Sequence, residues 1–309
     1  MKILQNTLKK QFSFSGISLH LGRWVNVKVH PAFENHGVQF LRTDVKNKDP
    51  RIKAVYNAVS DTNFSTQIRN KDGTSVQTIE HLMAALAGTG IHNALIEIDG
   101  PELPILDGSS REFVKLILSS GKRALRAPVN GFKVTKEIIV RDRIAWAKFS
   151  PSDALSIDFS IDYSDTVIGR QNLRLSMKNG SFVRELCDSR TFCRESEISS
   201  LKARGLAKGG NLENAIVLEP TKIQNVDGLR RTDECVRHKM LDAMGDLSLA
   251  GGPIIAAFSS NLGGHTLTNK LLRTAFSDED SMLPIRIVKN QATQLPGFGL
   301  READLCNLD

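Results

Sequence analysis

Apolar and polar residues alternate along the first sixty residues, as they do in β-strands with one buried face. In WVNVKVHPA, the apolar residues Val25, Val27 and Val29 alternate with polar ones, and successive strand residues point to opposite faces of a sheet. The segment GVQFLRT, at residues 37–43, repeats this alternation. We therefore expect short strands here, each with one face on a core.

The pattern becomes helical after residue 73. Thr78 is a suitable N-cap, which places Glu80 and His81 in the first helical turn. The glycines of AGTG are expected to end this helix, and the apolar segment IHNALIEI predicts a strand after it. An amphipathic helix at about residues 110–120 follows.

A stretch rich in basic and turn residues, GKRALRAPVN, interrupts the pattern at residues 121–130. A chain of 309 residues is long enough for two domains at about 150 residues per domain. We place the boundary in this stretch, with a first α+β domain at 1–126 and a second at 127–309.

The second domain repeats the order of the first: strands, a histidine-bearing helix, a glycine stop, an apolar strand and another helix. HLMAALAG, which begins at His81, is echoed by HKMLDAMG, which begins at His238. This similarity suggests two alike α+β halves whose histidines face each other across an interface. Interfaces of this kind are favoured places for active sites.

The segment 232–249 aligns four polar residues on one helix face. Glu234, His238, Asp242 and Asp246 recur at intervals of four, and residues that far apart are neighbours on a helix surface. His238 and Asp242 are suitable ligands for a metal ion. A solvated face with pairs of charges along the helix is the alternative interpretation.

A third ligand from the first half would complete a metal site. His81, His238 and Asp242 form a His-His-carboxylate set, which leaves a zinc position open for water or substrate. Glu80 would then be the natural general base. His265, in a Gly-Gly-His loop, is a candidate for a protonated stabiliser or general acid. Other enzymes and metal-free binding proteins remain open on these residues alone.

Composition and charge narrow the classes of function. The chain is 40% hydrophobic and 24% charged with a net charge of +7, which is typical of a globular protein with anionic partners. It has neither a long basic run nor a nucleic-acid-binding signature, which argues against nucleic acid as a partner. No apolar run approaches the length of a membrane span or signal-peptide core.

Cysteine spacing indicates the compartment. Without CxxC pairs or framework spacing, reduced thiols in a cytosol are expected, so we predict a soluble cytoplasmic protein. The four cysteines are Cys187, Cys193, Cys235 and Cys306.

Five separated motifs resemble the bacterial UDP-3-O-acyl-N-acetylglucosamine deacetylase family, whose members catalyse the committed step of lipid A synthesis. They are TIEHLMAALAGTGIHN, LPILDGSS, SRTFC, VRHKMLDAMGDL and GGHTLTNKLL. The resemblance runs in register from GISLHLG to the loop at His265. It is weaker at 193–197 and in about the last thirty residues.

The resemblance implies an α+β fold in which helices lie between two sheets, with a small insert in each domain. It also implies that His81, His238 and Asp242 are ligands of Zn²⁺. Glu80 matches the general base, and His265 matches the charged imidazole that stabilises the oxyanion and protonates the leaving amine.

Further positions match by the same resemblance. Asp246 corresponds to the carboxylate that orients His265, and Thr191 to a hydroxyl that hydrogen-bonds the oxyanion. The insert at about 194–214 corresponds to a passage for the acyl chain. Implied substrate contacts are Lys239 and Phe192 near the site, and Ile198, Leu201, Leu206, Ala207 and Gly210 along the passage.

A few positions are less clear. His20 lies in a Gly-bounded turn, where a structural role and the family's near-site histidine are both open. Family members often have a lysine where Ile144 and Ala145 stand in this chain. The resemblance therefore suggests that the nearby Arg143 contacts the diphosphate in its place. Glu234 matches no role, and we interpret it as a surface charge.

The implied reaction is hydrolysis of the N-acetyl amide of UDP-3-O-acyl-N-acetylglucosamine, which releases acetate. The implied protein is a monomer without a nucleic-acid partner or a transmembrane segment. One alternative is a zinc amidohydrolase that acts on another N-acetylated sugar nucleotide. A basic nucleic-acid-binding protein without metal is the alternative from a different class.

Overall fold

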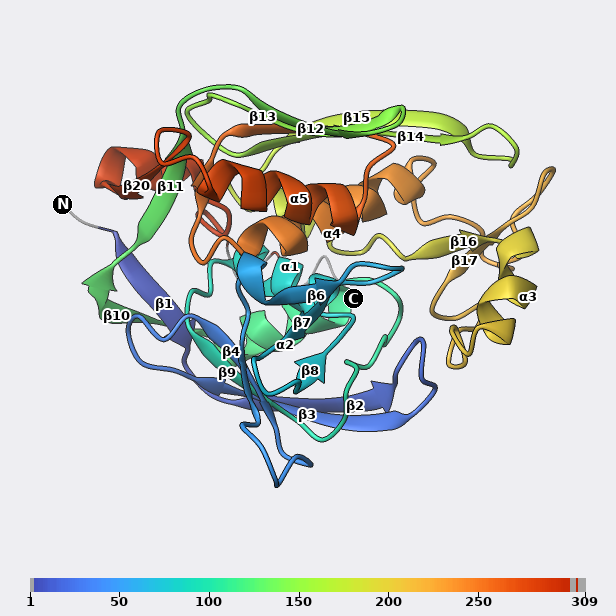
Figure 1. Cartoon of the computed structure of the whole chain (residues 1–309), viewed down its shortest axis with the longest axis horizontal. Helices are drawn as coiled ribbons and strands as arrows, with labels where there is room; N and C mark the ends of the chain where they lie inside the picture. The colour runs from blue at the N-terminus through green and yellow to red at the C-terminus, as the bar shows by residue number, and fades with distance from the viewer. Residues whose placement is uncertain (1–2, 301–303, 305–309) are drawn as a thin grey trace.

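A computed structural model describes residues 3–300 and Asp304. Two five-stranded sheets form its outer layers, and four helices lie between them (Figure 1). The helices in the middle layer are α1 (Glu80–Thr89), α2 (Arg111–Ser120), α4 (Glu234–Ser248) and α5 (His265–Phe276).

Each outer sheet belongs to one half of the chain. The first consists, in spatial order, of β2 (Phe12–Ile17), β3 (Trp24–Pro31), β9 (Ala94–Ile98), β4 (Val38–Arg42) and β5 (Arg51–Lys53). The second consists, in spatial order, of β12 (Ile138–Asp142), β13 (Ala145–Ser150), β19 (Ala257–Asn261), β14 (Ser156–Tyr163) and β15 (Gly169–Ser176).

The two sheets have the same topology. In the first, β9 pairs antiparallel with β3 and parallel with β4. In the second, β19 pairs antiparallel with β13 and parallel with β14. In both halves one helix precedes this central strand and one follows it. The predicted α+β class with two similar halves is therefore confirmed.

Alternation in the sequence explains which face of each sheet is buried. Along β3, Val25, Val27 and Val29 are buried while the residues between them are exposed. Val29 stands opposite Ile96 of β9, so these apolar side chains form the floor on which α1 and α2 pack. Burying branched side chains on one face stabilises the sheet because that apolar area is removed from water.

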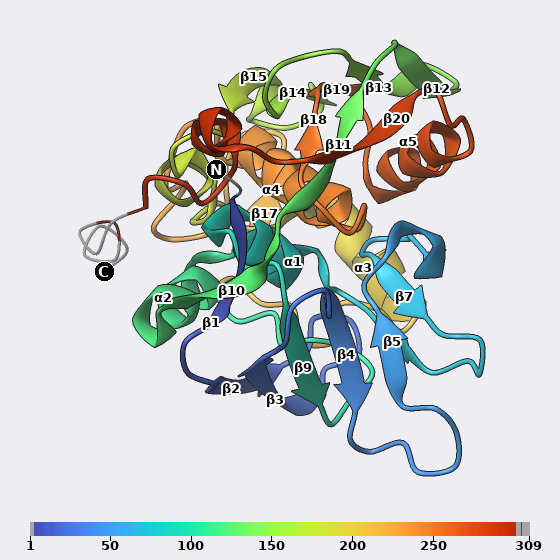
Figure 2. The same ribbon diagram turned by 90° about the vertical axis from the view of Figure 1, so that its left-hand side faces the viewer.

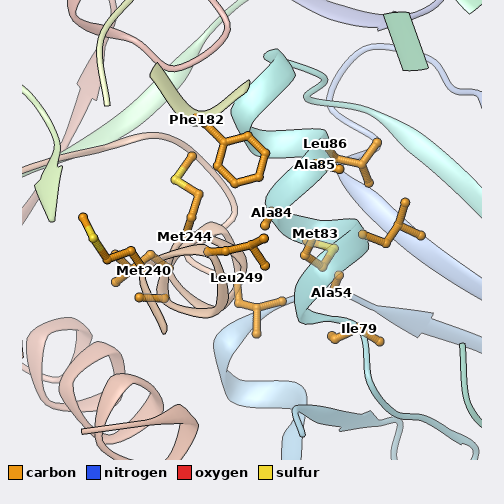
Figure 3. Packing of buried hydrophobic residues seen from close by; sticks show 14 of the residues in the cluster. Ala54, Ile79, Met83, Ala84, Ala85, Leu86, Phe182, Met240, Met244 and Leu249 are labelled. Atoms are coloured by element: carbon orange, nitrogen blue, oxygen red, sulfur yellow. The ribbon is translucent and has the colours of Figure 1, made fainter. Parts of the chain in front are cut away.

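Helices α1 and α4 pack directly against each other at the centre of the molecule. Figure 3 shows Met83 and Ala84 of α1 beside Met240 and Met244 of α4. A Cβ at Gly245 would lie 2.1 Å from the carbonyl oxygen of Glu80, so only glycine permits this approach. Close packing here places the start of α1 beside the middle of α4.

Smaller elements connect and extend the two halves. Strand β10 runs from the first half towards β11 in the second (Figure 2). The small sheets are β1 (Leu4–Leu8) with β10 (Lys122–Pro128), β18 (Ile254–Ile255) with β11 (Asn130–Val134) and β20 (Met282–Arg286), β6 (Val59–Asp61) with β7 (Gln67–Arg69) and β8 (Ser75–Val76), and β16 (Phe192–Arg194) with β17 (Ile216–Leu218). The remaining helices are α3 (Glu195–Ala203), η1 (Tyr56–Ala58), η2 (Phe182–Leu186) and η3 (Lys289–Gln294).

The start of α1 differs in detail from the prediction. Ile79 is the N-cap residue, and Thr78 lies before it with a φ of 58°. The Thr78 hydroxyl donates to Glu102 instead of capping the helix. Glu80 and His81 nevertheless open the helix, as expected. The domain boundary, which falls within β10, stays a proposal.

Three cysteines, Cys187, Cys193 and Cys235, are free thiols, and Cys306 lies outside the described residues. Within the described part of the chain, every helix is too short or too polar to cross a membrane.

Candidate active site

Two histidines and an aspartate converge where α1 begins beside the middle of α4. His81 is the second residue of α1, and His238 and Asp242 are one turn apart on α4. The Nε2 atoms of His81 and His238 lie 3.5 and 3.4 Å from Oδ1 of Asp242. All three side chains are buried, and their ligand atoms lie within 4.8 Å of one another. The structure thus brings the three predicted ligands together.

The donor set fits a metal cation. Nδ1 of His238 lies 3.0 Å from the carbonyl oxygen of Ser189, so Nδ1 carries the proton of the neutral ring and Nε2 presents a lone pair. That lone pair faces Oδ1 of Asp242, which is buried and has no hydrogen-bond partner. A cation between these atoms would satisfy both, and two imidazoles with one carboxylate suit catalytic zinc.

Charge states at this cluster also suit metal binding. Burial lowers the pKa of His238 to about 4 despite the opposing effect of Asp242, so the ring is neutral at pH 7. Burial opposes ionisation of Asp242 as well, but His238 and Lys239 outweigh it and hold its pKa well below 3.8. Nζ of Lys239 donates to Oδ2 of Asp242 at 2.8 Å, which leaves Oδ1 for the metal.

Glu234 is a buried structural anchor, so its interpretation as a surface charge was wrong. Its carboxylate is fully buried and accepts hydrogen bonds from the backbone N–H and Nε of Arg190, at 3.0 and 2.9 Å, and from the backbone N–H of Arg230. Arg190 follows Ser189, whose carbonyl orients His238. The buried ion pair therefore holds the loop that sets the orientation of a predicted metal ligand.

A chain of hydrogen bonds joins Glu80 to His265. The backbone N–H of Thr66 donates to Glu80 at 3.0 Å, and the Thr66 hydroxyl donates to Asp246 at 2.6 Å. The other Asp246 oxygen lies 2.7 Å from Nδ1 of His265, which is the first residue of α5. The predicted orienting carboxylate thus contacts the predicted imidazole.

Burial and neighbouring charges shift the pKa of the predicted base and that of the predicted acid by different balances of effects. Burial raises the pKa of Glu80, although His265 and His81 oppose that shift. Burial would lower the pKa of His265, but Asp246 and other carboxylates outweigh it and raise that pKa to about 9. At pH 7 the His265 ring is therefore cationic, with Nδ1 on Asp246 and its Nε2–H on the metal side, 3.9 Å from Asp242.

Sequence reasoning missed Thr66. Its side chain is buried, and it lies directly before β7, 14 residues from Glu80 of α1 and 180 residues from Asp246 of α4. A single threonine in a short loop carries no spacing signal. Only the folded chain brings it between Glu80 and Asp246.

Thr191 and Phe192 lie on the other side of His238. The backbone N–H of Thr191 donates to the carbonyl oxygen of Gly108 at 2.8 Å. Gly108 has a φ of 82°, and a Cβ there would lie 2.0 Å from the carbonyl oxygen of Asn214. The ring of Phe192 lies 6.1 Å from that of His238. Phe192 therefore borders the metal cluster, and Thr191 precedes it in the chain. The contacts of both residues with substrate stay predictions.

The proposed acyl passage follows β16. Ile198 and Leu201 lie on α3, which stands beside β16 and β17 at one end of the molecule in Figure 1. Leu201 is buried and Ile198 half-buried. Leu206, Ala207 and Gly210, in the loop after α3, are also half-buried. Their role as an acyl passage stays a prediction.

His20 links that loop to the start of α1. Its carbonyl oxygen accepts from the backbone N–H of Lys208 at 3.2 Å, and its own N–H donates to Glu102 at 2.7 Å. Glu102 also accepts from Thr78, two residues before Glu80. Burial lowers the pKa of the buried His20 ring although Glu102 opposes the shift, so the ring is neutral at pH 7.

Arg143 is exposed in the turn between β12 and β13. Trp146, three residues later on β13, pairs with Asn261 of β19. Asn261 comes three residues before Gly264, the residue that precedes His265. Arg143 therefore belongs to the end of the sheet from which the His265 loop departs. Its contact with a diphosphate stays a prediction.

Comparison with known proteins agrees with this geometry. The family model for UDP-3-O-acyl N-acetylglycosamine deacetylase matches residues 5–277. The chain belongs to this deacetylase family. The match covers both sheets and every residue of the metal cluster and the Glu80–His265 chain of hydrogen bonds.

Similar family members extend over nearly the whole chain. A UDP-3-O-acyl-N-acetylglucosamine deacetylase from Phenylobacterium zucineum is 41% identical over 279 residues, which is 90% of this chain and 95% of that protein. Deacetylases of the same name from Histophilus somni and Pasteurella multocida are 43% and 42% identical over 281 residues, which is 90% of this chain and 92% of each relative.

Proposed function

We propose that this chain hydrolyses the N-acetyl amide of UDP-3-O-acyl-N-acetylglucosamine in lipid A synthesis, with Zn²⁺ as its cofactor. The single observation that carries the proposal is the buried His81–His238–Asp242 cluster, with an unpaired carboxylate oxygen, next to Glu80 and a cationic His265. The names of the relatives supply the substrate.

The ligand set supports zinc in particular. When bound, zinc supplies Lewis acidity for the amide carbonyl and activation of water. Three protein ligands leave a coordination position open, as a catalytic site requires. A structural zinc would instead take four ligands, often cysteines, and among the described cysteines none belongs to the cluster.

The residues around the ligands divide the remaining chemistry. Glu80 takes a proton from the attacking water, because burial favours its protonated form. The His265 cation, with help from the Thr191 hydroxyl, stabilises the oxyanion that forms on the carbonyl oxygen. His265 then gives its Nε2 proton to the leaving nitrogen, the C–N bond breaks, and acetate and a free amine are released.

Substrate contacts follow from the same arrangement. Phe192 and Lys239 flank the cluster on the side of β16, where α3 and its following loop would take the acyl chain. Arg143, at the end of the other sheet, would contact the diphosphate. The net charge of +7 favours such an anionic substrate. We further propose that the protein acts as a monomer in the cytoplasm.

An acetate-release assay tests the proposal. Purified protein should release acetate from UDP-3-O-acyl-N-acetylglucosamine, lose this activity with a chelator, and regain it with zinc. Zinc analysis should give about one ion per chain at the three-ligand site. Protein that lacks bound zinc and releases no acetate after zinc is added would contradict the proposal.

The acyl chain distinguishes this function from its nearest rival. A deacetylase for another N-acetylated sugar nucleotide would act equally well on UDP-N-acetylglucosamine without the 3-O-acyl group. We expect a much higher kcat/KM for the acylated substrate, because chain burial contributes binding energy. Equal values for both substrates would support the rival.

A further inference from the structure

A cavity lies at the other end of the α1–α4 pair from the metal cluster. It has a volume of about 580 Å³, within the range of roughly 300–1,000 Å³ that is usual for small-molecule sites. Its walls include Leu86 and Ala87 of α1, and Met244 and Leu247 of α4. None of the proposed catalytic residues or metal ligands lines it. We call it the rear cavity.

The floor of the rear cavity is apolar and separate from the metal cluster. Met83 is the lining residue of α1 nearest to His81 in the sequence, and two positions along a helix turn its side chain by about 200°, away from the metal cluster. Met244 and Leu247 are buried, and their side chains come from the last turns of α4. This floor suits a hydrocarbon chain, since each buried methylene contributes roughly 0.8 kcal/mol.

The charged residues around the cavity are all of one sign. Its described lining includes Lys53 and Lys122 but no aspartate or glutamate. Nζ of Lys122 donates to the carbonyl oxygens of Thr89 and Gly297, at 3.0 and 3.3 Å. An ammonium has three N–H donors, so one remains. No carboxylate of the described residues pairs with Lys122.

A histidine supplies a second donor. The backbone N–H of Asn6 donates to Nδ1 of His92 at 3.0 Å, which places the proton of the neutral ring on Nε2. Burial lowers the pKa of His92 to about 4 and Lys122 adds to that effect, so the ring stays neutral at pH 7. Both His92 and Lys122 line the cavity.

The outer wall is formed by the segment after η3. Leu295 and Gly297 line the cavity, and a Cβ at Gly297 would lie 2.4 Å from the backbone N of Gly90. The glycine lets this segment lie directly on the end of α1. This wall lies outside the residues that the family model matches, which end at 277.

We propose that the rear cavity binds a single-chain amphiphile with a carboxylate head group. The carboxylate accepts hydrogen bonds from the free N–H of Lys122 and from Nε2–H of His92, and its chain lies on the floor between α1 and α4. A charge-assisted hydrogen bond of this kind is about twice as strong as a neutral one. The site is distinct from the acyl passage proposed beside β16, and it does not depend on the deacetylase function.

Calorimetric titration of the zinc-loaded protein with dodecanoate tests the proposal. We expect Lys122→Gln to weaken binding by about tenfold or more, as loss of a charged hydrogen bond implies. Ala87→Phe should abolish binding in the rear cavity by filling it. Lys28→Gln, which changes an exposed lysine on β3, should leave binding unchanged. Dodecyltrimethylammonium, with the opposite charge, should not compete.

Hydrogen exchange locates the ligand without any substitution. Dodecanoate should protect residues 86–92 and 289–300. Protection confined to 194–214, with affinity unchanged in Lys122→Gln and Ala87→Phe, would mean that it binds only in the acyl passage and would overturn the proposal. Absence of binding to wild-type protein would overturn it too. Acetate release by the wild-type protein, measured in parallel, does not depend on whether dodecanoate binds in the rear cavity.

Discussion

The two halves of the molecule have the same topology but contribute differently to the site. Each has a five-stranded sheet of equivalent strand order, with one helix before its central strand and another after it. In the echo between the halves, Ala85 and Thr89 of α1 stand where α4 has Asp242 and Asp246. In the proposed mechanism, the first half supplies one histidine ligand and the general base, and the second half supplies the other two ligands and the general acid.

The different contributions of the two halves follow from a few side chains at equivalent positions of α1 and α4. Thr89 donates its hydroxyl to the carbonyl oxygen of Ala85 at 2.7 Å, so that its polar group is satisfied within its own helix. Asp246, in the corresponding place, reaches out to Thr66 and His265. Two halves with the same backbone topology can therefore form an asymmetric site. The difference comes from which polar side chain stands at each equivalent helix position.

Removal of the base should have the largest effect. Glu80→Gln should lower kcat by about 10²–10⁴-fold, as loss of a general base does, while zinc content stays at the wild-type level. Arg237 occupies the corresponding position in the second half and pairs with Asp233 and Glu185. Arg237→Gln should change kcat little. Equal losses in both variants, or a near-normal kcat in Glu80→Gln, would remove Glu80 from this role.

Asp242→Ala makes α4 resemble α1 at the metal-binding position. It should reduce zinc content well below one ion per chain, because a three-ligand site loses its only carboxylate. Elemental analysis after dialysis measures this. Thr89→Ala, which alters a polar group of α1 outside the cluster, is the matched control and should keep its zinc. Unchanged zinc in Asp242→Ala would exclude Asp242 as a ligand.

Asp246→Asn should shift the pH dependence. Asp246 is the main group that keeps the pKa of His265 raised to about 9 against the effect of burial. The His265 cation is therefore present below that pKa and lost as pH rises through it. Without the carboxylate the pKa falls, and the alkaline limb of kcat/KM should move to lower pH. A limb at the wild-type position would show that His265 is not the acid.

Glu234→Gln should have the smallest of these effects. The substitution removes the charge that pairs with Arg190. The position of the Ser189 carbonyl, which orients His238, is then less well fixed. Loss of such a supporting contact typically costs about 10–100-fold in metal affinity, which competition with a chelator measures as the Kd for zinc. Glu213→Gln, at an exposed glutamate, is the control. An unchanged Kd would limit Glu234 to stabilising the fold.

Local patterns were enough to predict much of this protein. Alternation marked β3, and four-residue spacing put His238, Asp242 and Asp246 on one face. Of the two glycines expected to end α1, Gly90 does so and Gly88 lies within the helix. These signals are readable because side-chain direction repeats every two residues in a strand and every 3.6 in a helix. The resemblance to a family then added the roles of His81 and His265, and its family assignment is confirmed by the match over residues 5–277.

Tertiary structure decided what no local pattern records. Thr66 became a bridge between Glu80 and Asp246, and Glu234 became a buried anchor, because segments far apart in the sequence meet there. A glutamate on a polar helix face has the same local pattern whether it faces water or Arg190. The sequence by itself therefore determined the elements and the chemical groups, whereas packing of the two halves determined which groups are buried, paired and able to act together.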